Sequence, residues 1–273
     1  MTALLRIDDL RVTYGRGRHA SEVLKGVSLE IAPGETLGLV GESGSGKTTV
    51  GRAVLGLVRP SSGSIRFEDR EISDLSPRRR RGLARDLQVV FQDPYSSLDP
   101  AMRVSDILIE PLLGQGVGKR EAIDRIEEIL NRVGMPSDSI HRHPREFSGG
   151  QRQRIAIARA LVLRPKLVVC DEPVSALDLT TQRKVLDLLL DLQADIGAAY
   201  LFISHDLAVI RHVSHRVAVL RHGELVETGP ARVVTSSPAH EYTRRLLAAH
   251  LVADPDEQAR RRTQRLALAA GNV

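Results

Sequence analysis

The sequence predicts an α/β protein, in which strands and helices alternate along the chain. Short apolar runs alternate with longer helical patterns through most of the 273 residues. One apolar run leads directly into a glycine-rich loop and then into a helix, and residues from about 93 to 147 show helical patterns without a convincing strand. With 42% apolar residues, the chain can bury one sizeable core. We therefore expect one compact domain with inserted or appended pieces.

The N-terminal part is expected to begin with strands. The strand-like runs cover residues 5–14, 23–31 and 63–67. Pro33 and Gly34 supply a turn after the second run. The apolar run 36–40 passes into glycines, and a helical pattern extends from Lys47 to about Leu57. These features predict a strand, a loop and a helix in immediate succession.

The stretch from about 93 to 147 is expected to be a helical insertion, entered from a strand at 87–91. One helical face in it consists of Ala122, Ile123, Ile126, Ile129, Leu130 and Val133. Gly134 and Pro136 then end that helix.

Strand and helix alternate again after the insertion. We expect a buried strand at 167–170, a helix at 180–196 that ends at Gly197, and a strand at 199–203. The core side of the helix consists of Val185, Leu188, Leu189, Leu192 and Ile196. Short helices from about residue 230 lead into a polar, arginine-rich tail.

The composition argues against several classes of protein. No run of about 18 uncharged apolar residues occurs, and acidic residues follow the N-terminus closely, so neither a membrane-spanning nor a secreted chain is expected. The single cysteine, Cys170, cannot form an internal disulfide or a multi-thiolate metal site, and its apolar neighbours predict burial.

The net charge of +5 could favour nucleic acid or an anionic membrane surface. Arginines gather at residues 77–85 and 259–265, but only 3% of the residues are aromatic, which is too few for base-stacking platforms. We interpret both runs as solvated faces and expect no nucleic acid partner.

The strongest local signal is a loop that matches G-x-x-x-x-G-K-[ST] between a strand and a helix. It consists of Gly41, Glu42, Ser43, Gly44, Ser45, Gly46, Lys47 and Thr48, and Thr49 follows. Backbone N–H groups can converge on phosphate oxygens in such a loop. Lys47 then reaches the β- and γ-phosphates of a nucleotide, and Thr48 offers its hydroxyl to Mg²⁺. A chance Gly/Ser-rich turn before a lysine would not explain the flanking strand and helix.

Two carboxylates follow the buried strand at 167–170. Asp171 could hold Mg²⁺ through water, and Glu172 could polarise an attacking water as general base. Alone, such a pair could equally begin a solvated loop. Its value as evidence comes from the presence of Lys47 and Thr48.

Two other polar residues follow apolar strands. Gln92 could accept a hydrogen bond from Mg²⁺-bound water, and His205 could bond the γ-phosphate or the attacking water. In isolation, a glutamine or histidine at such a position is more often a loop, surface or capping residue. We interpret the neighbouring Asp93, Asp178 and Asp206 as parts of solvated turns.

Ser148, Gly149, Gly150 and Gln151 open another helix. The spacing of the serine and the glutamine fits a capping box. The glycines leave N–H groups at the helix start that could bind an anion, although a plain N-cap is the simpler interpretation.

Taken in order, these residues resemble the ATP-binding cassette (ABC) ATPases, and the match extends from about residue 4 to residue 250. Residues 41–48 resemble the Walker A loop, Gln92 the Q-loop, 147–151 the family signature, 167–172 the Walker B strand, 175–178 the D-loop and His205 the switch histidine. The signature separates this family from other P-loop proteins. Phe147 stands where the family usually has leucine.

The resemblance implies a P-loop NTPase (RecA-like) core with an antiparallel β subdomain and an inserted helical subdomain at about 93–147. This ATPase domain would cover residues 1–250, and a polar arginine-rich tail would cover 251–273. The resemblance also implies ATP and Mg²⁺ as cofactors and a head-to-tail dimer around two ATP molecules.

In each implied site, one subunit supplies Lys47, Thr48, Gln92, Asp171, Glu172 and His205, of which Thr48, Gln92 and Asp171 serve the metal. The other supplies Ser148, Gly149 and Gly150, with Gln151 beside them. Tyr14 lies where the family stacks an aromatic ring on adenine, and a strand-packing role is equally expected for it.

Residues 90–100 and 238–247 resemble a narrower branch, the second ATPase subunit of oligopeptide, dipeptide and nickel importers. This implies a second ATPase subunit, identical or related, two membrane-spanning permease subunits and, indirectly, a solute-binding protein. It also implies a peripheral position on the cytoplasmic face of the cell membrane. Many relatives carry a cysteine cluster for an iron–sulfur centre, which the single cysteine here cannot supply.

Two other functions compete with import. A soluble ABC protein of DNA repair or translation usually has two cassettes or long insertions, unlike the single cassette expected here. An exporter ATPase subunit would be distinguished by the membrane proteins that copurify with it.

Overall fold

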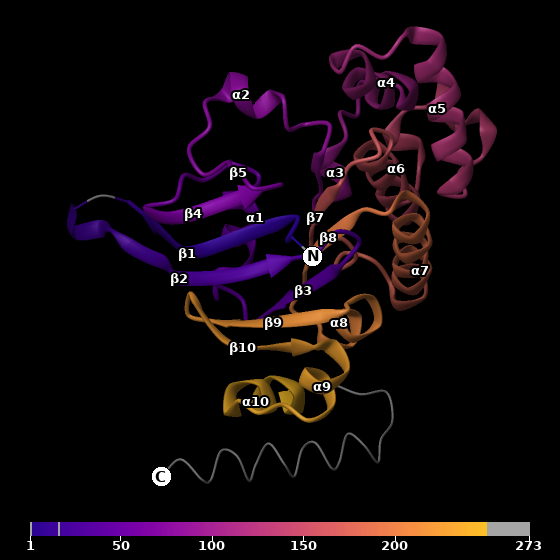
Figure 1. The fold of residues 1–273 in the computed structure, drawn as a ribbon. Coiled ribbons are helices and arrows are strands. Elements are labelled where there is room, and N and C mark those ends of the chain that lie inside the picture. Colours follow the sequence, from indigo (N-terminus) through magenta and orange to yellow (C-terminus); the bar gives the residue numbers. More distant parts are fainter. Residues whose placement is uncertain (1, 16, 250–273) are drawn as a thin grey trace.

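The computed structural model describes residues 2–15 and 17–249 (Figure 1). The strands are β1 (Leu5–Tyr14), β2 (Ser21–Ile31), β3 (Thr36–Val40), β4 (Ser62–Phe67), β5 (Arg70–Glu71), β6 (Leu87–Val90), β7 (Leu167–Asp171), β8 (Ala199–Ile203), β9 (Arg216–Arg221) and β10 (Glu224–Pro230). The α-helices are α1 (Lys47–Val54), α2 (Pro77–Arg81), α3 (Pro94–Ser97), α4 (Val104–Gly114), α5 (Lys119–Arg132), α6 (Gly149–Leu161), α7 (Leu179–Ile196), α8 (Leu207–Val213), α9 (Ala231–Ser236) and α10 (Glu241–Ala249). Short 3-10 helices cover Gly17–His19, Ser137–His141 and Pro144–Glu146.

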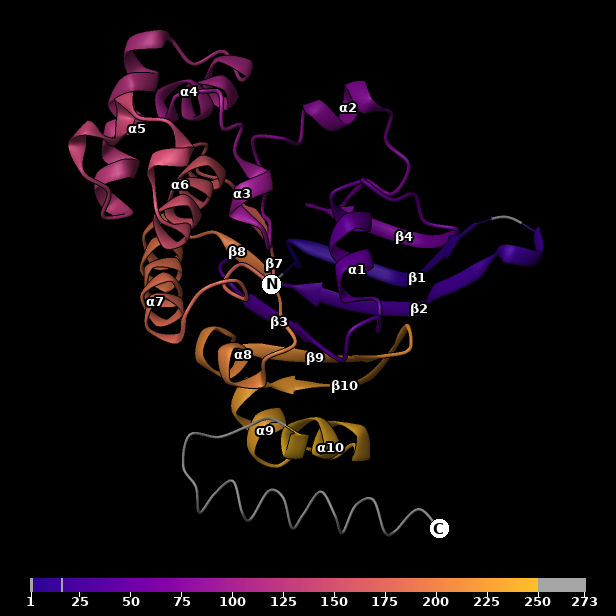
Figure 2. The same cartoon turned by 180° about the vertical axis from the view of Figure 1, so that it is seen from behind.

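Two sheets organise the chain (Figures 1 and 2). The larger has the order β10-β9-β3-β8-β7-β6, in which the pairs from β9 to β6 are parallel and β10 is antiparallel to β9. The smaller, β2-β1-β4-β5, is antiparallel throughout. This is the mixed α/β architecture that the sequence predicts, with the antiparallel sheet as a separate layer.

The central strands of the larger sheet are buried on both faces. In β7, Val168 and Cys170 pack with residues of α6 and α7, whereas Leu167 and Val169 pack with α1 and the antiparallel sheet. The alternation follows from the pleat, which sends successive side chains to opposite faces. Cys170 is fully buried, as its neighbours predict, and burial raises the pKa of its thiol.

Most expected elements are present, with differences at their ends. The observed bounds of β1, β3 and β8 equal the expected ones. Helix α1 ends at Val54, earlier than expected, because Gly56 adopts a left-handed backbone with φ of 70° that stops the helix. Gly197, with φ of 73°, ends α7 at the expected place. Helix α8 and strands β9 and β10 were not predicted from the sequence.

The described elements between residues 93 and 147 are helices, as expected. One residue of the predicted apolar face departs from the prediction, because Ile123 is 37% exposed while the other members of that face are buried. Ile123 lies at the edge of the stripe that the buried residues of α5 form, so it faces partly outward. In α7, Leu188 and Ile196 are likewise only partly buried.

Candidate functional site

The predicted polar segments meet at one edge of the larger sheet. The glycine-rich loop follows β3, His205 follows β8, Asp171 ends β7, and Gln92 follows β6. These strands are neighbours in the order β3-β8-β7-β6 and are parallel, so their carboxyl ends lie along the same edge. Such an edge is the usual ligand-binding side of an open α/β sheet. The sheet therefore assembles groups that are far apart in the sequence.

The glycine-rich loop surrounds the ammonium group of Lys47. Its Nζ atom donates to the carbonyl oxygens of Gly41 at 2.7 Å and Glu42 at 2.9 Å. Burial lowers the pKa of Lys47, and the charges of nearby carboxylates oppose this shift. Gly46 has φ of 106°, a backbone conformation that favours glycine. The loop thus holds a cation beside a helix N-terminus, an arrangement suited to a phosphate group.

Two further features of the loop were not evident from the sequence. The backbone N–H of Glu42 donates to the hydroxyl of Tyr242 in α10 at 3.1 Å, across 200 positions of the chain. No local pattern could indicate this contact. Ser45 is also part of the loop, and its buried hydroxyl has no hydrogen-bond partner among the described residues.

Thr48 and Asp171 form a polar pair beneath the loop. The Thr48 hydroxyl donates to Oδ1 of Asp171 at 3.0 Å. Burial raises the pKa of the Asp171 carboxyl, and the Thr48 hydrogen bond opposes that shift. A cation next to this partly buried carboxylate would offset the free-energy cost of burying its negative charge.

The donor set fits Mg²⁺. This ion commonly takes one or two protein oxygens and completes its shell with water and phosphate. Within the described residues, no group of three or more His, Cys, Asp or Glu could hold a metal ion by itself. An ion held by Thr48 and Asp171 would therefore need oxygens from a nucleotide or from water.

Glu172 and His205 form a second pair. Glu172 adopts a left-handed backbone with φ of 48°, which is uncommon outside glycine. Its N–H donates to the carbonyl oxygen of Ile203 at 2.9 Å, which ties it to the end of β8. Its Oε2 atom lies 3.1 Å from Nδ1 of His205. The Glu172 side chain is 17% exposed and the His205 side chain 57%, so the carboxylate is the sheltered member.

A pocket of about 500 Å³ opens over the loop. It is lined by Tyr14, Val23, Ser43, Gly44, Gly46, Lys47, Thr48, Thr49, Arg52, Gln92 and Glu172. All of these except Val23 and Arg52 are predicted site residues. Arg52 could have been found from its position one helical turn after Thr48, which places it on the same face of α1. Asp171 and His205 do not line the pocket themselves. Each contacts a lining residue: Asp171 contacts Thr48, and His205 contacts Glu172.

The turn at 148–151 lies outside this pocket. Ser148 and Gln151 form the predicted capping box: the Ser148 N–H donates to Oε1 of Gln151 at 3.0 Å, and the Gln151 N–H donates to the Ser148 hydroxyl at 3.3 Å. The neighbours of the two glycines are Tyr95 beside Gly149 and Thr181 beside Gly150. One copy of the chain therefore does not bring this turn to its own glycine-rich loop.

The three neighbouring aspartates have structural roles that the sequence interpretation missed. Asp93, Asp178 and Asp206 are the N-caps of α3, α7 and α8 and accept backbone N–H groups within 2.7–3.0 Å. Hydrogen bonds from Tyr95 and Thr181 lower the pKa values of Asp93 and Asp178. These carboxylates fix helix starts.

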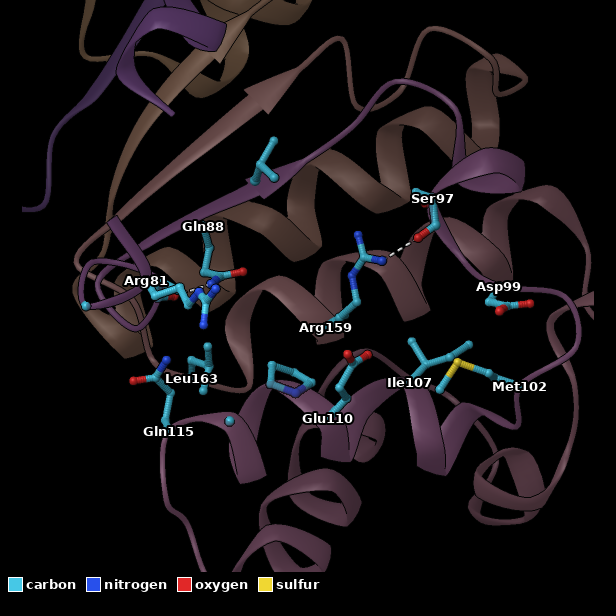
Figure 3. A pocket seen from close by; sticks show the side chains of 15 residues that line it. Arg81, Gln88, Ser97, Asp99, Met102, Ile107, Glu110, Gln115, Arg159 and Leu163 are labelled. Atoms are coloured by element: carbon cyan, nitrogen blue, oxygen red, sulfur yellow. Dashed lines mark hydrogen bonds between the residues drawn. The ribbon is translucent and has the colours of Figure 1, made fainter. Parts of the chain in front are cut away.

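A larger groove of about 870 Å³ lies where the insertion meets the core (Figure 3). Its lining comes from the end of α2 through β6, from α3 through α4, and from α6 and the residues after it. Within it, Arg159 donates to the carbonyl oxygen of Ser97 at the end of α3. Burial lowers the pKa of Arg159, and the charge of Glu110 across the groove opposes that shift.

None of the described helices combines the length and the apolar character needed to cross a bilayer.

Comparison with known proteins adds family evidence. The family model described as ABC transporter matches residues 24–175. The chain is 54% identical over 244 residues to the glutathione import ATP-binding protein GsiA of Escherichia coli O157:H7, and 50% identical over 250 residues to that of Salmonella paratyphi A. These alignments cover 89% and 91% of the chain, but only 38% and 40% of the relatives. The chain thus spans about two fifths of their length.

Two solved structures are similar over nearly their whole length. The ATP-binding cassette MJ0796, in a dimeric post-hydrolysis state bound to ADP and Pi, has a TM-score of 0.75 and 30% identity, covering 84% of this chain and 99% of that chain. The cbiO1 protein of Clostridium perfringens, part of the ABC transporter complex cbiONQ, has a TM-score of 0.79 and 27% identity, covering 92% of this chain and 96% of that chain.

Proposed function

We propose, because this chain belongs to the ABC transporter family, that it binds and hydrolyses ATP and thereby energises import of peptides or nickel through separate membrane subunits. The observation that carries the proposal is the meeting of the phosphate-type loop, the Asp171–Thr48 pair and the Glu172–His205 pair at adjacent strand ends around one pocket.

The residues divide the work of hydrolysis. Phosphoryl transfer to water needs little covalent chemistry from a protein, so positioning and charge stabilisation do most of it. Lys47 exchanges its bonds to loop carbonyls for bonds to the β- and γ-phosphates. Glu172 accepts a proton from the attacking water as general base, and His205 holds that carboxylate from 3.1 Å away.

Thr48, Asp171 and Gln92 are the proposed holders of Mg²⁺. Thr48 would bind through its hydroxyl, and Asp171 and Gln92 through water. When bound, Mg²⁺ supplies positive charge that neutralises phosphate oxygens. The raised pKa of the Asp171 carboxyl supports this assignment, because a burial cost of that kind is relieved by a cation.

A second ATPase subunit is the proposed source of Ser148, Gly149 and Gly150 for each site. The position of this turn outside its own chain's pocket supports a head-to-tail dimer. The similar cassette MJ0796, which is dimeric and bound to ADP and Pi, supports the same arrangement. Identical or related subunits would both satisfy this geometry.

The relatives support import over export and over a role in DNA repair or translation, since they are named for glutathione import and glutathione is a peptide. We propose that each ATPase subunit receives one of two permease subunits in the groove between insertion and core (Figure 3), and that a solute-binding protein acts through the permease subunits. The chain would then be peripheral, at the cytoplasmic face of the membrane.

The test is ATP binding and phosphate release by the purified chain and by Lys47→Ala. Removing the ammonium group should weaken ATP affinity and abolish turnover, whereas the exposed Lys119→Ala should behave like the parent. Equal ATP affinity in the parent and Lys47→Ala would refute the assignment of the loop. Copurification of permease and solute-binding proteins would separate importer from exporter.

A further inference from the structure

The arginine run at 77–85, which precedes β6, contains one residue unlike the others. Arg80, in α2, donates to the carbonyl oxygens of Val54 at 2.9 Å and Ile72 at 2.5 Å. Burial lowers the pKa of this guanidinium. Arg80 therefore anchors α2 to the core and leaves its arginine neighbours facing solvent.

Those neighbours form an arginine ridge, defined as Arg78, Arg79, Arg81 and Arg85. All are exposed, and within residues 2–15 and 17–249 none of their guanidinium groups has a hydrogen bond or an ion pair. Two acidic side chains just before the ridge pair with other arginines, since Asp74 pairs with Arg59 and Glu71 pairs with Arg66. The positive charge of the ridge is thus not neutralised by the described part of the chain.

The ridge lies at the end of the molecule from which the insertion projects. In both views α2, α4 and α5 lie at the same end of the molecule, while α9 and α10 lie at the opposite end (Figures 1 and 2). Arg81 also lines the groove proposed to receive the permease subunits. A membrane-embedded partner in that groove would bring the ridge toward the bilayer surface.

We propose that the arginine ridge binds the anionic headgroups of the membrane lipids, an inference that rests on the membrane-associated function proposed above. Guanidinium groups suit phosphate oxygens because their N–H donors are planar and paired. Nucleic acid carries the same phosphates, but no aromatic side chain lies within residues 77–85 to stack on bases. The bilayer is therefore the favoured partner.

The test is sedimentation of the 273-residue chain with vesicles of phosphatidylcholine alone or with about a quarter phosphatidylglycerol. The test variant is Arg78→Gln, Arg79→Gln and Arg85→Gln together, which leaves the groove residue Arg81 in place. The matched control is Arg211→Gln, Arg232→Gln and Arg244→Gln, which removes the same charge from exposed residues of α8, α9 and α10 that have no ion pair among the described residues.

Binding should require phosphatidylglycerol, weaken with salt and fall by about a hundredfold in the test variant, with little change in the control. ATP affinity should stay equal in all three proteins, which shows that the variants are folded. If the parent protein did not bind ATP, the proposed function would be refuted, and the vesicle-binding result would be unaffected.

Four outcomes would overturn the proposal. The test variant could bind vesicles as the parent does, or the control could lose as much binding. Binding could disappear instead with Arg260→Gln, Arg261→Gln and Arg262→Gln, which would place it in the tail. Finally, duplex DNA or RNA could bind through the ridge while the vesicles do not.

Discussion

The Nδ1 atom of His205 lies 3.1 Å from the Oε2 atom of Glu172, and the two residues follow neighbouring parallel strands, β8 and β7. The contact is reinforced by the backbone bond from Glu172 to Ile203, so the carboxylate has a fixed position at the edge of the pocket. A general base needs such a position more than it needs strength.

Replacing Glu172 with glutamine removes the general base and keeps the size and shape of the side chain. Turnover should fall by about a hundredfold or more, while ATP still binds and holds the dimer closed. Phosphate release and size-exclusion chromatography with ATP measure the two effects. Hydrolysis at the parental rate in this variant would show that Glu172 is not the general base.

Tyr14 is 39% exposed and lines the pocket, where its ring could stack on a nucleotide base. Tyr14→Ala should raise the dissociation constant for ATP by about tenfold or more, and Tyr14→Phe should leave it unchanged because the ring remains. Titration with a fluorescent ATP analogue measures both. Equal affinity in all three proteins would assign Tyr14 to strand packing alone.

Asp171 should make the nucleotide-free protein less stable as pH rises. Its pKa in the folded state is raised above the ordinary value of 3.8, so the folded state holds the proton more tightly than the unfolded state. Its contribution to stability therefore falls as pH rises from 3.8 through the raised pKa, and the loss persists above it. Asp171→Asn should remove this loss.

Urea unfolding without nucleotide at several pH values checks this. Asp171→Asn should be the more stable protein at pH 8 and should lose its advantage in acid, although its ATP hydrolysis is lost. An Asp171→Asn protein less stable than the parent at pH 8 would show that the carboxylate is stabilising in the fold.

Gly149 should tolerate a methyl group in the single chain, because the atoms nearest to a Cβ there belong to Tyr95 and Leu177 and lie at 3.4 Å or more. In a closed dimer the same methyl group would stand between the N–H groups of the turn and the partner's phosphate. Gly149→Ala should therefore keep ATP affinity and lose ATP-driven dimerisation in a Glu172→Gln background. Dimers as abundant as those of Glu172→Gln alone would argue against the head-to-tail arrangement.

Cys170 should be chemically silent in the folded protein. It is fully buried in β7, and burial raises the pKa of its thiol, so little reactive thiolate forms at neutral pH. Labelling by iodoacetamide should proceed only after unfolding by urea. Rapid labelling of the native protein would mean that this part of the sheet opens.

Local chemistry explains what the sequence by itself determined. Gly46 permits the left-handed turn before α1, Ser148 and Gln151 cap α6 from three residues apart, and Gly197 ends α7. Each depends on conformational preferences or hydrogen bonds within a few residues, and these can be predicted from the residue types alone. The type of most elements and the identity of the pocket-lining loop were predictable for this reason.

Only the tertiary structure decided which of these elements are neighbours. Strand order placed Glu172 against His205, and α10 carried Tyr242 to the Glu42 amide. Packing also made Arg80 an anchor while its neighbours in the same run stay in solvent. Such contacts depend on how sheets and helices stack in three dimensions, and hydrophobic periodicity specifies the buried face of an element but not the partner that covers it.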